Sequence, residues 1–158
     1  MDLTDIKIVL VAPTHPGNIG AAARAMKTMG LKNLVLVQPK SFPHQIASDR
    51  SAGADDILEQ ALVVESLPEA LTGCQIVFAM SARSREISLP VMKPEVCARL
   101  VSTFSLNTKV AIMFGREHAG LTNDELLLAN YHVCIPANPD YSSLNLAQAV
   151  QIMAYELR

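Results

Sequence analysis

VAIMFGREHAGLTNDELLLANYHVCIPANPDYSSLN, residues 110–145, is the stretch that decides the fold of this 158-residue chain. It contains two short apolar segments, 110–114 and 131–135, which predict strands that each continue directly into a polar loop. In a parallel sheet, loops that leave the C-terminal ends of neighbouring strands meet in one crevice, the usual place for a ligand. The two loops therefore predict one composite pocket, to which they contribute Gly115, Arg116, Glu117, Gly120, Pro136, Asn138, Pro139, Ser142, Ser143 and Asn145.

Apolar runs and helical patterns alternate along the whole chain. Continuous β-branched runs such as IKIVLV at 6–11 are typical of strands buried on both faces. The last helix carries an apolar stripe at helical spacing, made of Leu146, Ala149, Val150, Met153, Ala154 and Leu157. We expect strands at 6–11, 34–37, 61–64, 75–80, 110–114 and 131–135, and helices at 21–29, 44–52, 67–71, 95–104, 122–129 and from 145 onward. This order predicts one α/β domain over residues 1–158, with a mainly parallel sheet and helices on both faces.

The composition argues against several classes of protein. No run approaches the roughly 18 apolar residues of a membrane span, and the start, MDLTDIKIVLVAP, is acidic where a signal peptide would be basic. Cys74, Cys97 and Cys134 are scattered and odd in number, which predicts reduced thiols in a cytoplasmic protein. The sequence has no cluster with metal-ligand spacing. We therefore expect neither a metal nor a membrane partner.

Charge is unevenly distributed along the chain. The net charge of −2 gives no support to a strongly cationic nucleic-acid binder, yet residues 1–50 hold six Lys or Arg against three acidic residues. A locally basic first third can still contact phosphates. A solvated mixed surface is the alternative.

The turn after the first strand does not match a dinucleotide-binding loop. Residues 15–24 read HPGNIGAAAR, which lacks the G-x-G-x-x-G spacing, and the second strand ends at Gln38 where a ribose-binding acid is expected. The chain also lacks the G-x-x-x-x-G-K-[ST] pattern of a phosphate-binding loop. These departures argue against binding of NAD or a nucleoside triphosphate.

Several polar residues have two interpretations on sequence alone. Asn18 can cap a helix while Arg24 points to water, or the helix start and Arg24 can bind a phosphate together. Glu117 can favour the start of the next helix, and Ser142, Ser143 and Asn145 can be capping residues, or all four can belong to the pocket.

Three motifs, taken in this order, resemble those of the SPOUT superfamily of RNA 2′-O-methyltransferases, in the branch named after TrmH and SpoU. They are Asn18-x-Gly20-Ala-x-x-Arg24, Phe114-Gly-x-Glu117-x-x-Gly120-Leu121, and Ile135-Pro136 with Ser142-Ser143-Leu144-Asn145. The likeness covers the whole chain. The pieces SARSR, FGREHAGLTNDEL and IPANPDYSSLNLAQAVQIMAYELR are most similar to members that methylate the ribose at position 32 of the tRNA anticodon loop.

This resemblance implies a fold and a reaction that periodicity does not supply. It implies a C-terminal trefoil knot, whereas general topology rules predict an ordinary open sheet. It also implies S-adenosylmethionine as cofactor, S-adenosylhomocysteine as product, tRNA as substrate, no metal, and a homodimer packed through the first and last helices. The tRNA enzymes of this kind carry a C-terminal extension, and we expect residues 1–158 to comprise the methyltransferase domain without it.

The resemblance also assigns roles to residues. The cofactor pocket would consist of Met80, Ser81, Ala82, Gly115, Ile135, Ser142, Ser143 and Leu144. Arg24 would be the catalytic arginine, acting at the cofactor of the other subunit, and Asn18, Glu117, Ser142 and Asn145 would shape the site. RNA contacts would come from Arg24, Arg83, Arg85 and Tyr141. The alternatives are the same chemistry on another tRNA position or on rRNA, and a non-catalytic RNA-binding module with the same fold.

Overall fold

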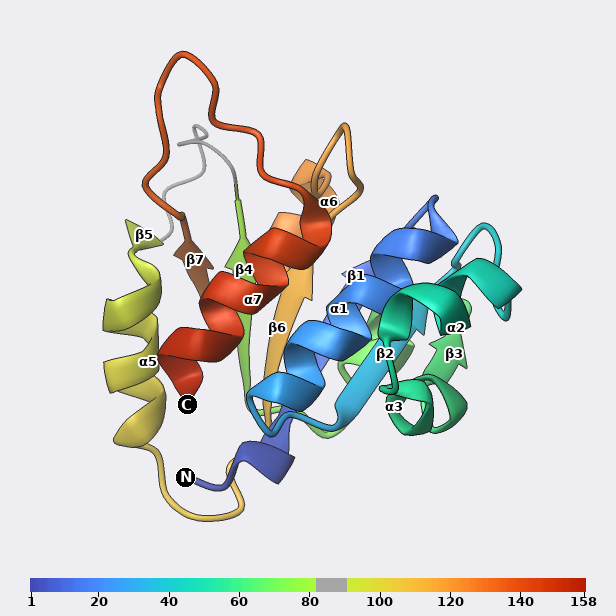
Figure 1. Ribbon diagram of the computed structural model, residues 1–158. Coiled ribbons are helices and arrows are strands. Elements are labelled where there is room, and N and C mark those ends of the chain that lie inside the picture. Colours follow the sequence, from blue (N-terminus) through green and yellow to red (C-terminus); the bar gives the residue numbers. More distant parts are fainter. Residues whose placement is uncertain (82–90) are drawn as a thin grey trace.

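A single parallel sheet organises the computed structural model, which describes residues 1–81 and 91–158. Its seven strands follow the order β3-β2-β1-β6-β4-β7-β5 (Figure 1). They are β1 (Ile6–Val11), β2 (Asn33–Val37), β3 (Leu62–Val64), β4 (Ile76–Met80), β5 (Val91–Met92), β6 (Val110–Phe114) and β7 (Tyr131–Val133). Every paired strand in this sheet runs parallel to its neighbour, so the predicted mainly parallel sheet is confirmed.

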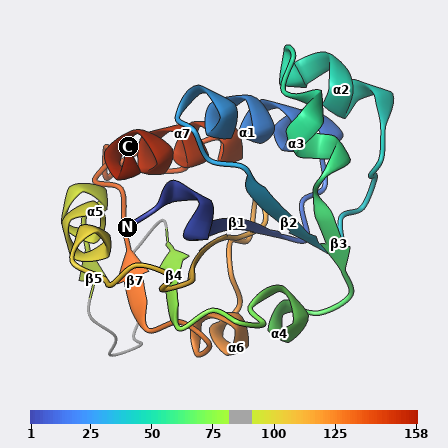
Figure 2. The same cartoon turned by 90° about the horizontal axis from the view of Figure 1, so that it is seen from below.

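Helices cover both faces of the sheet, as the alternating pattern predicted (Figure 2). One layer contains α1 (Pro16–Thr28), α2 (Gln45–Ser51), α3 (Asp55–Glu59), α5 (Pro94–Ser102) and α7 (Leu146–Leu157). The short helices α4 (Leu67–Ala70) and α6 (Asn123–Leu126) lie on the opposite face, and a 3-10 turn, Leu3–Asp5, precedes β1. Within the described residues, no helix has the length and apolar character needed to cross a membrane.

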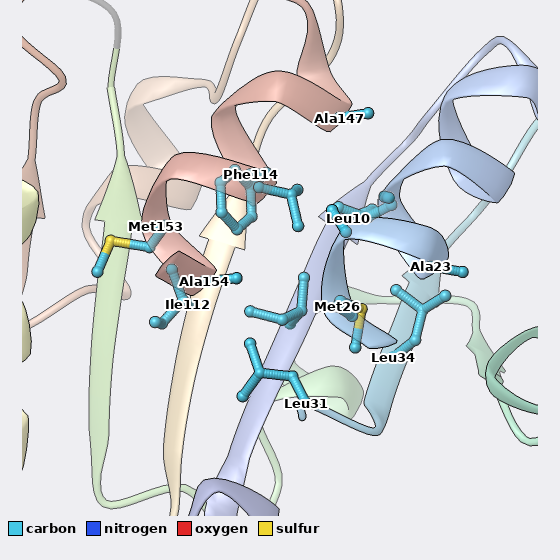
Figure 3. Packing of buried hydrophobic residues seen from close by; sticks show 14 of the residues in the cluster. Leu10, Ala23, Met26, Leu31, Leu34, Ile112, Phe114, Ala147, Met153 and Ala154 are labelled. Carbon is cyan, nitrogen blue, oxygen red and sulfur yellow. The ribbon is translucent and has the colours of Figure 1, made fainter. Parts of the chain in front are cut away.

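Alternate side chains of the central strands build two cores. In β1, Ile8 and Leu10 belong to the core under the larger helical layer, whereas Val9 and Val11 belong to the core under the opposite face. Figure 3 shows side chains of the sheet and of α1 and α7 meeting in the first of these cores: Leu10, Phe114, Met26, Met153 and Ala154. Burial on both faces explains why these strands are continuous apolar runs.

Helix α1 begins earlier than the sequence pattern indicated. Pro16 occupies the first helical turn, where its missing N–H costs nothing, and His15 is the N-cap residue. Asn18 therefore lies inside the first turn of α1, and the interpretation of Asn18 as the helix cap is wrong. Its side chain is free to make the longer-range contacts described below.

The remaining differences from the predicted elements concern short segments. Helix α3 and strand β5 were not predicted, and β7 ends at Val133 where the pattern extended the strand to residue 135. Helix α6 ends at Leu126 because the next turn tightens, with Leu128 N–H donating to the carbonyl of Glu125. Such short elements depend on tertiary contacts more than on local pattern.

The three cysteines are unpaired thiols, as predicted. Cys97 is buried, and burial raises the pKa of its thiol to about 12.

The packing of α1 on α2 depends on one glycine. A Cβ atom at Gly20 would lie 2.0 Å from the carbonyl oxygen of Ala47, whereas a Cβ at Gly17 would meet its nearest neighbours at 3.6 Å. We expect Gly20→Ala to lower the free energy of unfolding by about 1–3 kcal/mol through overpacking. Gly17→Ala should leave it unchanged or raise it by up to about 1 kcal/mol. Urea denaturation of the two variants measures this, and equal stability of the two would contradict it.

Candidate functional site

A cavity of about 630 Å³ opens at the C-terminal edge of the sheet. The end of β4 with Ser81 and the loops that follow β6 and β7 form it, together with the first residues of α7. The cavity contains most of the pocket residues that the sequence pointed to: Met80, Ser81, Gly115, Glu117, Ile135, Ser142, Ser143 and Leu144. The two loops of residues 110–145 thus share one crevice, in the position that parallel-sheet topology favours.

The strand ends hold these loops close together. The N–H of Ser81, directly after β4, donates to the carbonyl of Val133 at the end of β7, with N and O 2.9 Å apart. Beyond β6, a Cβ atom at Gly115 would lie 2.2 Å from the carbonyl carbon of Gly120. Only glycine therefore fits at position 115 with this loop conformation.

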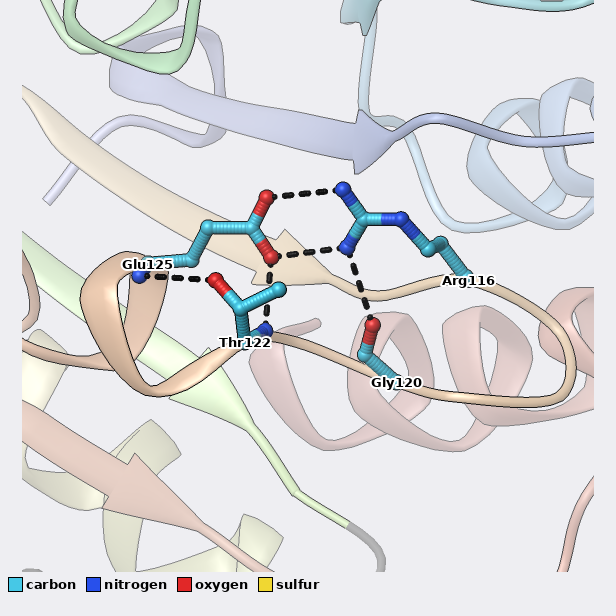
Figure 4. A network of polar contacts seen from close by, with 4 residues as sticks. All are labelled: Arg116, Gly120, Thr122 and Glu125. Carbon is cyan, nitrogen blue, oxygen red and sulfur yellow. Dashed lines mark hydrogen bonds and ion pairs between the residues drawn. The ribbon is translucent and has the colours of Figure 1, made fainter.

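The loop from Gly115 to Leu121 folds back on itself as a small hairpin. Arg116 and Gly120 exchange both backbone hydrogen bonds, at 3.1 and 3.0 Å. The next residues start α6 with a capping box: Thr122 Oγ1 accepts from the N–H of Glu125, and the Glu125 carboxylate accepts from the N–H of Thr122 (Figure 4). The Arg116 guanidinium donates to the same carboxylate. The contact between Arg116 and Glu125 was not predicted from the sequence.

Glu117, in the middle of this hairpin, binds the start of α1. Its carboxylate accepts from the N–H of Thr14 at 3.1 Å and of His15 at 3.0 Å, and from the hydroxyl of Thr14 at 3.0 Å. Asn18 Nδ2 donates to Oε2 at 3.2 Å. Glu117 therefore lies at the N-terminus of α1, and the interpretation that it favours the start of the following helix is wrong.

These donors determine the protonation of Glu117. Partial burial acts to raise the pKa of the carboxyl, but the hydrogen bonds from His15, Thr14 and Asn18 outweigh it and lower the pKa to about 2. The carboxylate is therefore a stable anion at neutral pH.

Asn18 extends the network to the last helix. Its Oδ1 accepts from Nδ2 of Asn145 at 3.1 Å, while Asn145 Oδ1 caps α7 by accepting from the N–H of Ala147 at 2.9 Å. Asn145 is thus both a capping residue and part of the polar network. Ser142 and Ser143 line the cavity and do not cap α7.

Two of the proposed RNA-contacting residues, Arg24 and Tyr141, do not line the cavity. Arg24 is exposed on α1 and does not line the cavity of its own chain. Tyr141 is 82% exposed on the loop before α7. Ala82, Arg83 and Arg85 lie outside the described residues.

Both apolar and polar residues line the cavity. Its apolar side chains include Leu121, Ile135, Leu144 and Leu146, and Cys134 adds a half-buried thiol. Neither Leu121 nor Cys134 was singled out as a pocket residue from the sequence. Pockets of a few hundred Å³ with few polar groups suit a small organic ligand. Among residues 1–81 and 91–158, no group of three His, Cys, Asp or Glu side chains could hold a metal ion.

Comparison with known proteins identifies the family. A model of the SpoU rRNA methylase family matches residues 5–155, so this chain belongs to the SpoU methylase family. The family predicted from the three motifs is thereby confirmed.

Individual proteins of known name or structure are also similar to this chain. The tRNA (cytidine/uridine/adenosine-2′-O-)-methyltransferase TrmJ of Pseudomonas aeruginosa (strain UCBPP-PA14) is 55% identical over 99% of this chain, which spans 61% of the length of that relative. The crystal structure of TrmJ from Z. mobilis ZM4 superimposes with a TM-score of 0.92 at 43% identity, covering 96% of this chain and 67% of that one. The SpoU methyltransferase AviRb from Streptomyces viridochromogenes, solved in complex with AdoMet, shares the fold, with a TM-score of 0.74 at 23% identity over 96% of this chain and 56% of its own.

The Glu117 network predicts a specific acid sensitivity. Because the folded-state pKa of about 2 lies below the ordinary value of 4.5, the unfolded chain takes up this proton first as pH falls. The contribution of Glu117 is therefore complete above pH 4.5 and is lost as pH falls toward 2. We expect Glu117→Gln to lower the free energy of unfolding at pH 7 and to flatten its dependence on pH in that range.

Urea denaturation at a series of pH values measures both effects. Glu156→Gln, which neutralises an exposed carboxylate on α7, is the matched control and should keep the wild-type profile. A Glu117→Gln profile parallel to that of the wild type would contradict the prediction.

Proposed function

We propose that residues 1–158 form a methyltransferase domain that transfers a methyl group from S-adenosylmethionine to a ribose 2′-hydroxyl of tRNA. The observation that carries this proposal is the cavity into which the family's second and third motifs converge, with the first motif hydrogen-bonded to its rim through Asn18. The identity of 55% to a tRNA 2′-O-methyltransferase supports the reaction and the RNA class. A cytoplasmic location follows from tRNA as substrate.

The residues around the cavity fit the cofactor. Backbone groups of Gly115 and of residues 142–144 would bind the adenine edge, while Ile135 and Leu144 would pack against its ring. Met80 and Ser81 would line the other side. AviRb, which shares the fold, was solved with AdoMet, and this supports the assignment. The cofactor would supply a methyl group that already carries its leaving group, so the proposal involves no metal and yields S-adenosylhomocysteine.

The proposal includes the trefoil knot of the family in the segment from β6 to α7. The chain arrangement supports it: β7 lies between β4 and β5 in the sheet, yet α7 packs beside α1 and α5. The loop that joins β7 to α7 passes over the strand ends and supplies one wall of the cavity (Figure 1).

Arg24 is proposed as the catalytic arginine. A guanidinium stays protonated near neutral pH, so it donates hydrogen bonds and does not act as a base. Arg24 would bind a phosphate beside the reacting ribose and stabilise the negative charge that forms on the 2′-oxygen. That phosphate or a water molecule would accept the proton. Arg83, Arg85 and Tyr141 would add contacts to the RNA.

The position of Arg24 supports a homodimer in which each subunit completes the site of the other. Arg24 is exposed and does not line the cavity of its own chain. Helices α1 and α7 lie side by side on one face of the sheet (Figure 1). Tyr155 of α7 is 61% exposed. Packing through these two helices would bring Arg24 to the partner's cavity.

The position proposed for methylation is ribose 32 of the anticodon loop, because the chain resembles enzymes of that specificity. One alternative is favoured by a specific observation: the matching family is described by its rRNA methylases, so rRNA is the second candidate substrate. Incubating the chain with labelled cofactor and either tRNA or rRNA, followed by mapping of the methylated nucleotide, separates the two. Failure to bind the cofactor in calorimetry would overturn the proposed function itself.

Arg24→Ala should abolish the reaction while leaving cofactor binding intact. We expect turnover to fall by about a hundredfold or more, the usual effect of removing a charge-stabilising donor. Arg24→Lys should also be poor, because a bidentate contact is lost. Lys27→Ala, one turn further along α1, is the control for charge. Calorimetry showing that Arg24→Ala has lost cofactor affinity would contradict the assigned role.

Mixing two inactive variants tests the shared site. Leu144→Trp fills the cavity but keeps Arg24, and Arg24→Ala keeps the cavity, so a mixed dimer has one complete site. An equimolar mixture should recover about a quarter of the wild-type activity per chain, since half of the randomly formed dimers are mixed. As a control, the Arg24→Ala variant taken alone through the same mixing procedure should stay inactive. Recovery equal to background would show that Arg24 does not act across the interface.

A further inference from the structure

The Arg116 side chain ties the hairpin over the cavity to the helix that follows it. Nη1 lies 2.8 Å from Oε1 of Glu125, and Nη2 lies 3.0 Å from Oε2, which makes a bidentate ion pair (Figure 4). Nη1 also donates to the carbonyl of Gly120 at 3.2 Å. One guanidinium thus contacts the far end of the hairpin and the first turn of α6. Bidentate pairs of this kind fix orientation as well as distance.

The pair is partly shielded from water. The side chains of Arg116 and Glu125 are 33% and 16% exposed, whereas those of the surface pair Lys27–Asp56 are 51% and 58% exposed. Hydrogen bonding to Glu125 raises the pKa of Arg116. Partial burial acts to raise the pKa of Glu125, but Arg116 and Thr122 outweigh it and lower that pKa. Both groups are charged at neutral pH, and their shielding makes the attraction stronger than that of an exposed pair.

The hairpin that this pair holds is a wall of the cavity. All of residues 115–121 line it, as does Leu126 of α6. The two sides of the hairpin are closely packed, since a Cβ atom at Gly115 would lie 2.2 Å from the carbonyl carbon of Gly120. Because Arg116 joins this hairpin to α6, we expect loss of the ion pair to change the shape of the wall while the strands beneath it stay in place.

We propose that Arg116 and Glu125 are positioning residues for the cofactor, holding residues 115–121 in the conformation that binds S-adenosylmethionine. The inference rests on the proposed function, because it concerns the same cavity. Neither residue needs to touch the ligand. They act by raising the affinity of the cavity for S-adenosylmethionine.

Because Glu117 holds the same hairpin through a different contact, the effect of the Arg116–Glu125 pair on cofactor binding can be measured separately. Glu117 joins the same hairpin to α1, the helix that carries Arg24, whereas Arg116 joins it to α6. Variants at Arg116 leave the α1 contact intact. They should therefore raise the KM for the cofactor by a larger factor than they lower kcat.

The variants follow from the contacts in Figure 4. Arg116→Lys keeps the charge but loses the fork that reaches both Glu125 oxygens, and Glu125→Gln keeps the size and the acceptor for Thr122 but loses the charge. Thr122→Ala is the matched control: it removes the capping hydroxyl of α6 and leaves the Arg116–Glu125 pair untouched. Lys27→Ala breaks an exposed ion pair elsewhere.

Isothermal titration with S-adenosylmethionine and S-adenosylhomocysteine measures the effect without turnover. We expect Kd to rise about tenfold in Arg116→Lys and in Glu125→Gln, the usual scale for losing one charged hydrogen bond. Thr122→Ala and Lys27→Ala should bind like the wild type, although Thr122→Ala should be less stable. Hydrogen exchange of the Arg116 and Gly120 amides should accelerate in Arg116→Lys and stay slow in Thr122→Ala.

The outcomes distinguish this inference from the proposed function. Wild-type protein that fails to bind either ligand refutes the proposed function. Wild-type binding with unchanged affinity in Arg116→Lys and Glu125→Gln overturns the positioning role alone. The positioning role also fails if Thr122→Ala weakens binding as much as these two variants do, because stability of α6 would then explain the loss.

Discussion

The carboxylate of Glu117 is the contact on which the arrangement of the site depends. It satisfies N–H groups at the start of α1 and, through Asn18, links the loop after β6 to Asn145 at the start of α7. A negative group at a helix N-terminus is also favoured by the helix dipole. One side chain therefore brings together the three segments that carry the family's motifs. The position of the cavity wall relative to α1, the helix that bears Arg24, is consequently fixed.

The parts of the fold that could be predicted are those with a strong local period. The apolar runs of β1 and β6 and the apolar stripe of α7 predicted these elements closely. A strand buried on both faces has a continuous apolar sequence, and a helix buried on one side has apolar residues at helical spacing. Strand β5 has two residues and forms only beside β7, so it has no such pattern. The order of the strands, and any knot, depend on contacts between distant segments that periodicity does not record.

The site was predictable in its location and less so in its connections. Placing the loops after β6 and β7 in one crevice required only parallel topology. The partners of Glu117 could not be found in that way, since Thr14 lies 103 positions away and a single sequence does not state which residues pair. Glu125 shows a different limit. Its capping role was complete with Thr122, so nothing in the local pattern indicated that its carboxylate also holds Arg116.

Arg116 and Glu117 are adjacent in the chain and reach in opposite directions, one to α6 and the other to α1. The two contacts together fix the position of each residue in the segment after β6. Adding one residue before position 116 would move Arg116 to the place of Glu117, with a cation against the positive end of α1, and deleting one would move Glu117 to the place of Arg116, with an acid against Glu125. Surface loops generally tolerate changes of length. Here a change of length directly before position 116 would remove at least one of the two contacts.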